Sequence, residues 1–259
     1  MVDAVTVVRV APEWDRPEVR KWCGRLEALA ATAPPEAEIY RGRNLIFRAE
    51  VGGREVAVKR FPVASLGKRL TYRVRTTKAV RTFDHAVRLA ALGVGTPAPL
   101  AAVEVRSGGW PVASYFCSEF LPRFLEARVL RLPETEDRTR LLGLLGAFVG
   151  RLHERGVLHL DLTAGNVLLV PDAAHPDGFA FQLVDINRMR FRHVGARAGI
   201  ANLVKLRLND EGEMFGGYCS ARGLDPGRWR RTYRARVALR SLRQDLMERT
   251  RPWRRRIGL

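Results

Sequence analysis

The residues with the clearest chemical spacing lie in the second half of the chain. His159, Asp161 and Asn166 follow the pattern His-x-Asp-x-x-x-x-Asn, which is the spacing of a phosphotransferase catalytic loop. In such a loop the Asp receives the proton of the acceptor hydroxyl, and the Asn holds a magnesium ion. Asp185 ends an apolar stretch nineteen residues further on and offers the oxygen ligand that Mg²⁺ prefers. We therefore expect Asp161 to be catalytic, Asn166 and Asp185 to bind the metal, and His159 to support the loop.

A lysine suited to phosphate binding lies on a strand near the N-terminal end. Gly52 and Gly53 separate two strand-like runs, as in a tight hairpin whose turn needs positive φ angles. The second run ends in Val-Ala-Val-Lys, close to the Val-Ala-Ile-Lys pattern of kinases, so we expect Lys59 to bind the phosphates of ATP. A helix expected from Thr82 to Leu92 carries Asp84, our candidate partner for the Lys59 ammonium. Kinases normally use the longer Glu at that place.

Other nucleotide contacts are expected from a turn and from a strand exit. The turn at residues 40–44 holds only Gly42, where a phosphate-covering loop is usually rich in glycine, so Arg43 or Asn44 would donate from side chains instead. The strand exit at residues 118–122 resembles a kinase hinge, in which the backbone groups of Glu119 and Leu121 face the adenine. An ordinary strand ended by Pro122 remains open as an alternative.

The elements that must position these residues suggest an α+β, two-lobed fold of the protein-kinase type. We expect residues 1–121 to form a β-rich nucleotide-binding lobe with an antiparallel sheet and a C-helix. Residues 122–259 are expected to form a mainly helical catalytic lobe with an Arg-rich C-terminal helix. The expected strands are 3–10, 100–106, 112–119, 167–170 and 179–184, and the expected helices are 12–31, 138–155, 200–207, 211–222 and 225–244.

Composition places limits on partners and compartment. The formal net charge is +18, which indicates an anionic partner. Residues 228–259 carry +10 of it, twelve Arg against two acids, so the tail need not describe the active site. Three widely spaced cysteines suggest neither a disulfide framework nor a zinc site. With no signal-like leader and no run of eighteen apolar residues, we expect a cytoplasmic protein that could associate peripherally with the inner membrane.

Two basic segments keep alternative interpretations open. Residues 64–82 interleave six Lys or Arg with Leu70, Tyr72 and Val74, and the segment is either a solvated helix face or a contact with an anionic surface. The tail, with apolar residues from Trp229 to Trp253, is either an amphipathic surface helix or a helix packed on its lobe.

At these motifs the chain resembles the protein-kinase-like superfamily, and more closely the lipopolysaccharide kinase (Kdo/WaaP) family. Asp-Ile-Asn-Arg in place of Asp-Phe-Gly narrows the resemblance. It implies ATP- and Mg²⁺-dependent phosphorylation of a Kdo or heptose hydroxyl in the lipopolysaccharide inner core, with a lipid A–core precursor as partner at the inner membrane. The stretches that carry it are 78–86, 93–97, 153–157, 159–161 and 184–190.

Two other functions are compatible with parts of this pattern. An atypical Ser/Thr protein kinase would use the same residues, but no Ala-Pro-Glu anchor follows Asp185, so a docking platform for peptides is not expected. A non-catalytic pseudokinase or scaffold whose tail binds nucleic acid would not need a complete catalytic set. Nucleic acid is therefore not the expected partner.

Overall fold

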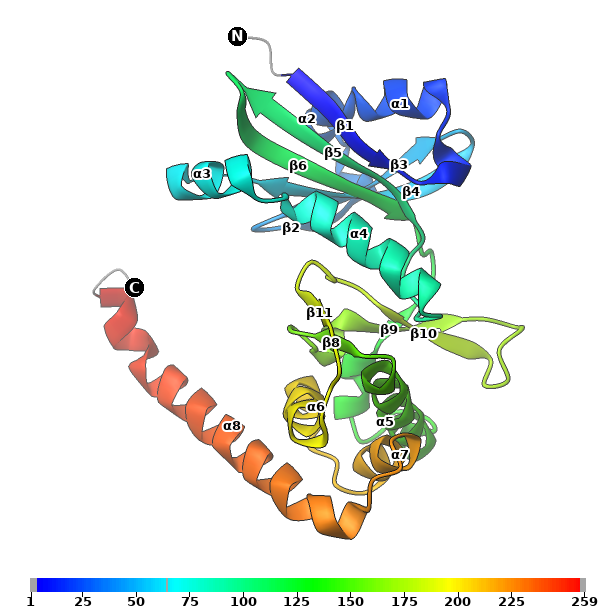
Figure 1. The fold of residues 1–259 in the computed structure, drawn as a ribbon, viewed down its shortest axis with the longest axis vertical. Helices are drawn as coiled ribbons and strands as arrows, with labels where there is room; N and C mark the ends of the chain where they lie inside the picture. The colour runs from blue at the N-terminus through cyan, green and yellow to red at the C-terminus, as the bar shows by residue number, and fades with distance from the viewer. Residues whose placement is uncertain (1–3, 64, 257–259) are drawn as a thin grey trace. The chain divides into compact units, whose positions relative to one another are not determined.

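The computed structural model describes residues 4–63 and 65–256, which form two compact units (Figure 1). The first unit contains the chain up to Phe124 together with Val170–Arg188, and the second contains Leu125–Leu169 and the chain from Met189 on. The predicted α+β class is confirmed, because the first unit is built on an antiparallel sheet and the second is mainly helical. The predicted lobe boundary follows Leu121, whereas the first unit ends at Phe124 and also takes in the segment that carries Asp185.

A six-stranded sheet forms the centre of the first unit, with the order β1-β5-β6-β4-β3-β2. Neighbouring strands in this sheet pair antiparallel. Gly52 and Gly53 have φ angles of 57° and 73° and join β3 to β4, because a two-residue hairpin of this kind needs positive φ at both central positions. The strands are β1 Ala4–Val10, β2 Glu38–Arg41, β3 Leu45–Val51, β4 Arg54–Pro62, β5 Pro99–Ser107 and β6 Trp110–Glu119.

The two faces of this sheet have different coverings. Successive side chains of a strand point to opposite faces, and on β4 Val56 and Val58 enter the core shared with α1 (Pro17–Cys23) and α2 (Leu26–Thr32). Lys59 alternates with them and therefore lies on the opposite face. The helix α4 (Lys78–Ala91) packs against β5 and β6, and Figure 1 shows it on the other side of the sheet from α1 and α2.

Two helical predictions need correction. The single helix predicted over residues 12–31 is divided into a short 3₁₀ turn (Pro12–Trp14), α1 and α2. Glycine weakens a helix interior, and at Gly24-Arg25 the chain bends so that both Cys23 and Leu26 reach the sheet core. The helix predicted from Thr82 begins four residues earlier, at Lys78, while the basic segment before it forms a separate helix, α3 (Leu66–Val74). Asp3, predicted to start the first strand, lies outside the described residues.

The second unit is organised around α5 (Arg138–Glu154), as predicted, and α7 (Glu213–Ala221). A side chain at Gly146 of α5 would collide with the carbonyl of Met214, so glycine permits the close approach of these helices. The remaining elements are β7 Leu125–Glu126, a 3₁₀ helix Ala127–Arg131, β8 Val157–His159, a 3₁₀ turn Ala164–Asn166, β9 Val167–Pro171, β11 Met189–Phe191, α6 Ala196–Leu203, η5 Val204–Leu206 and α8 Pro226–Arg256.

The C-terminal helix α8 is attached to the second unit through its first half. Tyr233 is buried, its ring lies 4.6 Å from that of Phe215, and its hydroxyl donates to the carbonyl of Asp210 at 3.0 Å. The side chains of the predicted tail residues from 245 on, Trp253 included, lie outside the described residues. Among the helices of residues 4–63 and 65–256, none is both long and apolar enough to cross a membrane.

Candidate functional site

Lys59 and Asp185 are brought together in the first unit, although 126 residues separate them. The Lys59 Nζ lies 2.8 Å from Asp185 Oδ1, and their side chains are 18% and 33% exposed. A charge-assisted hydrogen bond of this length holds the ammonium beside the predicted metal ligand. Asp185 follows β10 (Phe179–Leu183), which groups with the sheet unit, so one unit contains both predicted phosphate- and metal-binding side chains.

Asp84 does not form the predicted pair with Lys59. Its carboxylate lies 3.4 Å from the Nε of Arg9 on β1. The buried side of α4 is formed by Ala79, Val80, Phe83 and other small or apolar residues, which turns Asp84 towards β1. In this structure the carboxylate that holds Lys59 comes instead from the segment after β10.

Several contacts fix the backbone around Asp185. Its φ of 54° lies in the left-handed region, which Asp tolerates better than most residues but which still needs support from neighbours. The amide nitrogen of Asn187 donates to Asp185 Oδ1 at 2.8 Å. His85 of α4 donates from Nδ1 to the carbonyl of Ile186 at 2.7 Å, and Thr96 donates to the carbonyl of Leu183 at 2.8 Å. α4 and the 95–96 turn thus hold Asp185 from both sides.

A cluster of cations surrounds this pair on the same face of the sheet. The Nζ atoms of Lys59 and Lys78 lie 5.4 and 5.8 Å from the centroid of the Phe61 ring, a distance suited to cation–π attraction. Burial lowers the pKa of Lys78, the nearby Arg43 lowers it further, and Asp185 raises it. An anionic group bound here would relieve the repulsion between these cations, so Lys78 joins Arg43 as a candidate phosphate ligand.

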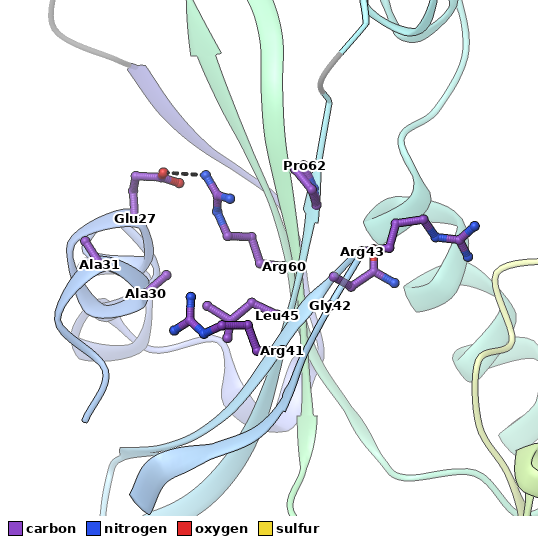
Figure 2. Close-up of a pocket in the computed structure, with 10 residues that line it drawn as sticks. Glu27, Ala30, Ala31, Arg41, Gly42, Arg43, Leu45, Arg60 and Pro62 are labelled. Carbon is purple, nitrogen blue, oxygen red and sulfur yellow. Dashed lines mark hydrogen bonds and ion pairs between the residues drawn. The ribbon is translucent and has the colours of Figure 1, made fainter. Parts of the chain in front are cut away.

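Arg43 and Asn44 lie in the turn between β2 and β3. Side chains near this turn point to opposite faces of the sheet. Figure 2 shows Arg43 pointing towards α4, whereas Arg41 points towards α2. On the α2 side the turn borders a groove of about 300 Å³ that Asn44 also lines. Of the two predicted nucleotide contacts from this turn, Arg43 has its side chain directed towards the Lys59 face.

A partly buried hydrogen-bonded cluster, of which Figure 2 shows Glu27 and Arg60, borders the groove. Arg60 donates to Glu27 Oε1 at 2.7 Å and to the hydroxyl of Tyr115 at 2.9 Å. The Tyr115 hydroxyl in turn donates to Glu27 through a short hydrogen bond. Burial and the bond to Glu27 hold the pKa of Tyr115 well above its ordinary value. This cluster ties α2 to the sheet, so we assign it to stability of the first unit.

The predicted hinge residues follow β6. The N–H of Glu119 donates to the carbonyl of Ala98 at 2.8 Å, and its carbonyl accepts the Ser118 hydroxyl at 3.3 Å, so the second lone pair of this carbonyl is the acceptor that a ligand could use. The N–H of Leu121 has no backbone acceptor among residues 4–63 and 65–256. One acceptor and one donor two residues apart are the groups that an adenine edge needs, so the hinge prediction is retained as a proposal.

The catalytic-loop residues lie together in the second unit. His159 is fully buried, and its Nδ1 accepts the backbone N–H of Asp161 at 3.1 Å. The amide nitrogen of Asn166 donates to the carbonyl of Asp161 at 2.8 Å, so the amide oxygen is the atom of this side chain that could ligate a metal. Lys205 donates from Nζ to the carbonyl of Leu160 at 2.6 Å. The backbone on both sides of Asp161 is therefore held by three side chains.

Behind this loop a chain of buried hydrogen bonds reaches α7. Asn202 of α6 donates to the carbonyl of His159 at 2.9 Å and accepts from His153 Nε2 at 3.1 Å. Because the Asn oxygen can only accept, His153 must carry its proton on Nε2, and its Nδ1 accepts from the Tyr218 hydroxyl at 3.0 Å. Arg222 donates to that hydroxyl at 2.8 Å. Each bond direction is fixed by the next, and together they require a neutral His153.

The network predicts a pH-dependent stability. Burial lowers the pKa of His153 to about 4, below the ordinary value near 6.5 of the unfolded chain. Between these pH values the unfolded state binds a proton that the folded state rejects, so this contribution is complete above pH 6.5 and is lost as pH falls towards 4. We expect a loss of roughly 3 kcal/mol from this group.

Urea unfolding at several pH values between 7.5 and 4 checks the expectation. His153→Gln keeps a donor for Asn202 but cannot titrate, so its stability should be lower at pH 7.5 and should fall less on acidification. Burial also lowers the pKa of His85. Both proteins contain His85, so its contribution to the pH dependence of stability cancels in the comparison. Equal pH slopes for the two proteins would rule out this role for His153.

A basic groove of about 370 Å³ lies between α6, η5 and α8 in the second unit. Of the residues that line it none is acidic, and the Arg240 Nε is buried without a hydrogen-bond partner among the described residues. Burial and the nearby Arg207 lower the pKa of Arg240. Lys205, which holds the catalytic loop, belongs to the same wall. The lining residues are Ala201, Val204, Lys205, Arg207, Arg236, Leu239, Arg240, Arg243 and Gln244.

The donor set suits a hard divalent cation. The carboxylate of Asp185 and, considered by itself, the amide oxygen of Asn166 are each the kind of ligand that magnesium accepts, and magnesium is usually held by one or two protein oxygens together with nucleotide phosphates. Among the described residues no cluster of three His, Cys, Asp or Glu side chains could hold a metal without a nucleotide. The side chains of Asp185 and Asn166 therefore fit magnesium by the chemistry of their oxygen atoms.

Sequence reasoning missed several residues that the structure places at the site. Lys78, His85 and Asn187 lie inside the stretches used for the family resemblance, but no role was assigned to them. Asn202 and Lys205 had no signal of their own, because each acts on a carbonyl more than forty residues away.

The fold and the sequence of the chain can be compared with those of known proteins. No curated protein matches the chain. A solved structure described as WaaP in complex with acyl carrier protein aligns with 94% of this chain and 99% of its own, with a TM-score of 0.61 and 20% sequence identity, which shows a common kinase-like fold. The family model for lipopolysaccharide kinases (Kdo/WaaP) matches residues 41–215, more than half of the chain. The chain therefore belongs to the lipopolysaccharide kinase (Kdo/WaaP) family and is a phosphotransferase with an alcohol group as acceptor.

Proposed function

We propose that the protein transfers the γ-phosphate of ATP to a hydroxyl of Kdo or heptose in the lipopolysaccharide inner core. Membership of the family supports a lipopolysaccharide kinase that uses ATP. The observation that carries the proposal is the fixed backbone around Asp161, held by His159, Asn166 and Lys205. Such rigidity serves a base that must meet a hydroxyl in one orientation.

Each residue has a defined task in this reaction. Asp161 orients the acceptor hydroxyl and takes its proton as the new P–O bond forms and the bond to ADP breaks. Lys59 and Lys78 bind phosphate oxygens, with Arg43 as a further donor. Asn166 and Asp185 supply the oxygen ligands for magnesium, which when bound neutralises part of the phosphate charge. With nucleotide present, the Lys59 ammonium would exchange its bond to Asp185 for contacts to phosphate.

The groove beside the catalytic loop supports a negatively charged acceptor. Five cations line it together with the apolar Val204 and Leu239, a combination that suits a glycolipid with phosphate or carboxylate groups better than a neutral hydroxyl compound. The unpartnered Arg240 Nε would gain a hydrogen bond on acceptor binding.

Arg240→Gln should therefore raise the KM for a lipid A–core acceptor about tenfold while leaving kcat and the KM for ATP close to wild type. Steady-state kinetics with [γ-³²P]ATP measure the three constants. Arg234→Gln is the matched control, because Arg234 lies on the same helix but pairs with Glu211 at 2.6 Å outside the groove. A fall in kcat alone would contradict a binding role for Arg240.

One experiment tests the function itself. Mass spectrometry of lipopolysaccharide from a strain that lacks the protein should show loss of one phosphate, restored by the wild-type gene but not by Asp161→Asn. Purified protein should label a lipid A–core acceptor from [γ-³²P]ATP. Label that appears only in cell protein, with no change in lipopolysaccharide mass, would overturn the sugar acceptor in favour of an atypical protein kinase.

A further inference from the structure

The helix α3 exposes an apolar stripe that no part of the first unit covers. Leu66, Leu70 and Val74 recur every four residues, which places them along one side of the helix. Their exposures are 77%, 58% and 83%, and no residue of α3 is buried. Three large aliphatic side chains in a row on one exposed helix are more than the scattered apolar residues of an ordinary surface.

The helix is formed and attached without using this stripe. Ser65 caps its N-terminus, its hydroxyl accepting from the N–H of Lys68 at 3.4 Å. The guanidinium of Arg73 lies 4.8 Å from the centroid of the Trp110 ring at the start of β6. Tyr72 is partly buried, and α3 contacts β6 as Figure 1 also shows. The attachment therefore uses Arg73 and Tyr72, and the three aliphatic side chains remain for another partner.

The charge of the segment indicates the chemistry of that partner. Residues 65–75, which include α3, contain four Lys or Arg and no acidic residue. A helix with aliphatic side chains along one side and basic residues beside them is the arrangement that lies in the interface of an anionic bilayer. Each basic residue near such a surface adds attraction, and long basic side chains can reach phosphates while aliphatic neighbours enter the acyl region.

We propose that α3 binds the protein peripherally to an anionic phospholipid surface, with Leu66, Leu70 and Val74 inserted at the boundary between headgroups and acyl chains. A lipid surface fits better than a protein partner, because three side chains on a nine-residue helix offer far less than the roughly 800 Å² per partner of a stable protein interface. The inference does not depend on the proposed sugar acceptor, but it would bring the enzyme to the surface where a glycolipid resides.

Vesicle co-sedimentation of the full chain tests the proposal. Wild-type protein should pellet with vesicles of phosphatidylglycerol and phosphatidylcholine and should bind pure phosphatidylcholine vesicles at least tenfold more weakly. Leu70→Glu replaces an inserted side chain by a repelled one on a helix that tolerates Glu, and should lower the partition coefficient on anionic vesicles about tenfold. Leu66→Glu should have a similar effect.

The control is Leu132→Glu, which makes the same charge change at an apolar residue that is 51% exposed outside α3. It should bind vesicles as wild type does. Circular dichroism and thermal unfolding establish that the variants are folded. If both α3 variants bind anionic vesicles like the control, or if removal of residues 245–259 abolishes binding that Leu70→Glu leaves intact, α3 is not the membrane contact. Unchanged ATP turnover in Leu70→Glu would separate this result from the kinase assignment.

Discussion

Replacing Asp161 with Asn is expected to lower kcat by about 10²- to 10⁴-fold, the usual contribution of a positioned general base. The amide occupies the same volume but cannot take the proton of the acceptor hydroxyl. The backbone contacts to His159, Asn166 and Lys205 use main-chain atoms of residues 160 and 161, so the loop should keep its shape. Single-turnover transfer from [γ-³²P]ATP measures the chemical step directly.

The affinity for nucleotide gives the internal check on this variant. Asp161→Asn should bind ATP as tightly as wild type in equilibrium titration, because Asp161 acts on the acceptor. Asp137→Asn is the matched control; Asp137 has a left-handed φ of 51° that Asn also accepts, and its side chain makes no capping bond. Retention of more than a tenth of wild-type kcat in Asp161→Asn would remove this residue from the catalytic role.

Replacing Lys59 with Met should lower kcat/KM for ATP by about 10²- to 10³-fold, the cost of removing one preorganised electrostatic donor. Met has a similar length and packs against the Phe61 ring but offers no charge to phosphate. It also removes the 2.8 Å bond from Lys59 to Asp185 while the bond from the Asn187 amide stays in place, so the predicted metal ligand should become less well oriented.

The comparison of two further variants separates these effects. Lys21→Met removes an exposed lysine from α1 and should leave all constants unchanged. Lys78→Met should raise the KM for ATP less than Lys59→Met does, because Lys59 makes the 2.8 Å bond to Asp185 and Lys78 lies beside that pair at the Phe61 ring. Near-normal kcat/KM in Lys59→Met would mean that another cation binds the phosphates and would refute the role inferred from the Lys59–Asp185 pair.

Local sequence patterns were sufficient to predict much of the secondary structure of the first unit. The Gly52-Gly53 turn, the alternation on β4 and the paired strands β5 and β6 depend on neighbouring residues, and the structure confirms them. The helix before the catalytic loop was equally accessible, since the apolar residues of α5 recur with helical spacing over seventeen residues. Signals within about twenty residues of one another therefore identified the elements and the order of the motifs.

The partner of Lys59 could not be obtained in that way. Whether Asp84 faces Lys59 depends on the rotation of α4 about its own axis, and that rotation is set by the packing of Val80 and Phe83 in the first unit. With this face buried, Asp84 meets Arg9. The break between α1 and α2 has the same origin, because burial of both Cys23 and Leu26 outweighs continuity of one helix.

The sequence by itself determined the chemistry: a base, a lysine and two oxygen ligands in kinase order, on elements of the right type. Only the tertiary structure decided how those groups are held. The pair of Lys59 with Asp185 spans 126 residues, and the support of His159 by Asn202 spans 43. Residue spacing along a chain determines which residues are neighbours within a helix or a hairpin. Contacts between distant elements depend instead on which faces are buried together, and the choice of buried faces is a property of the packed unit as a whole.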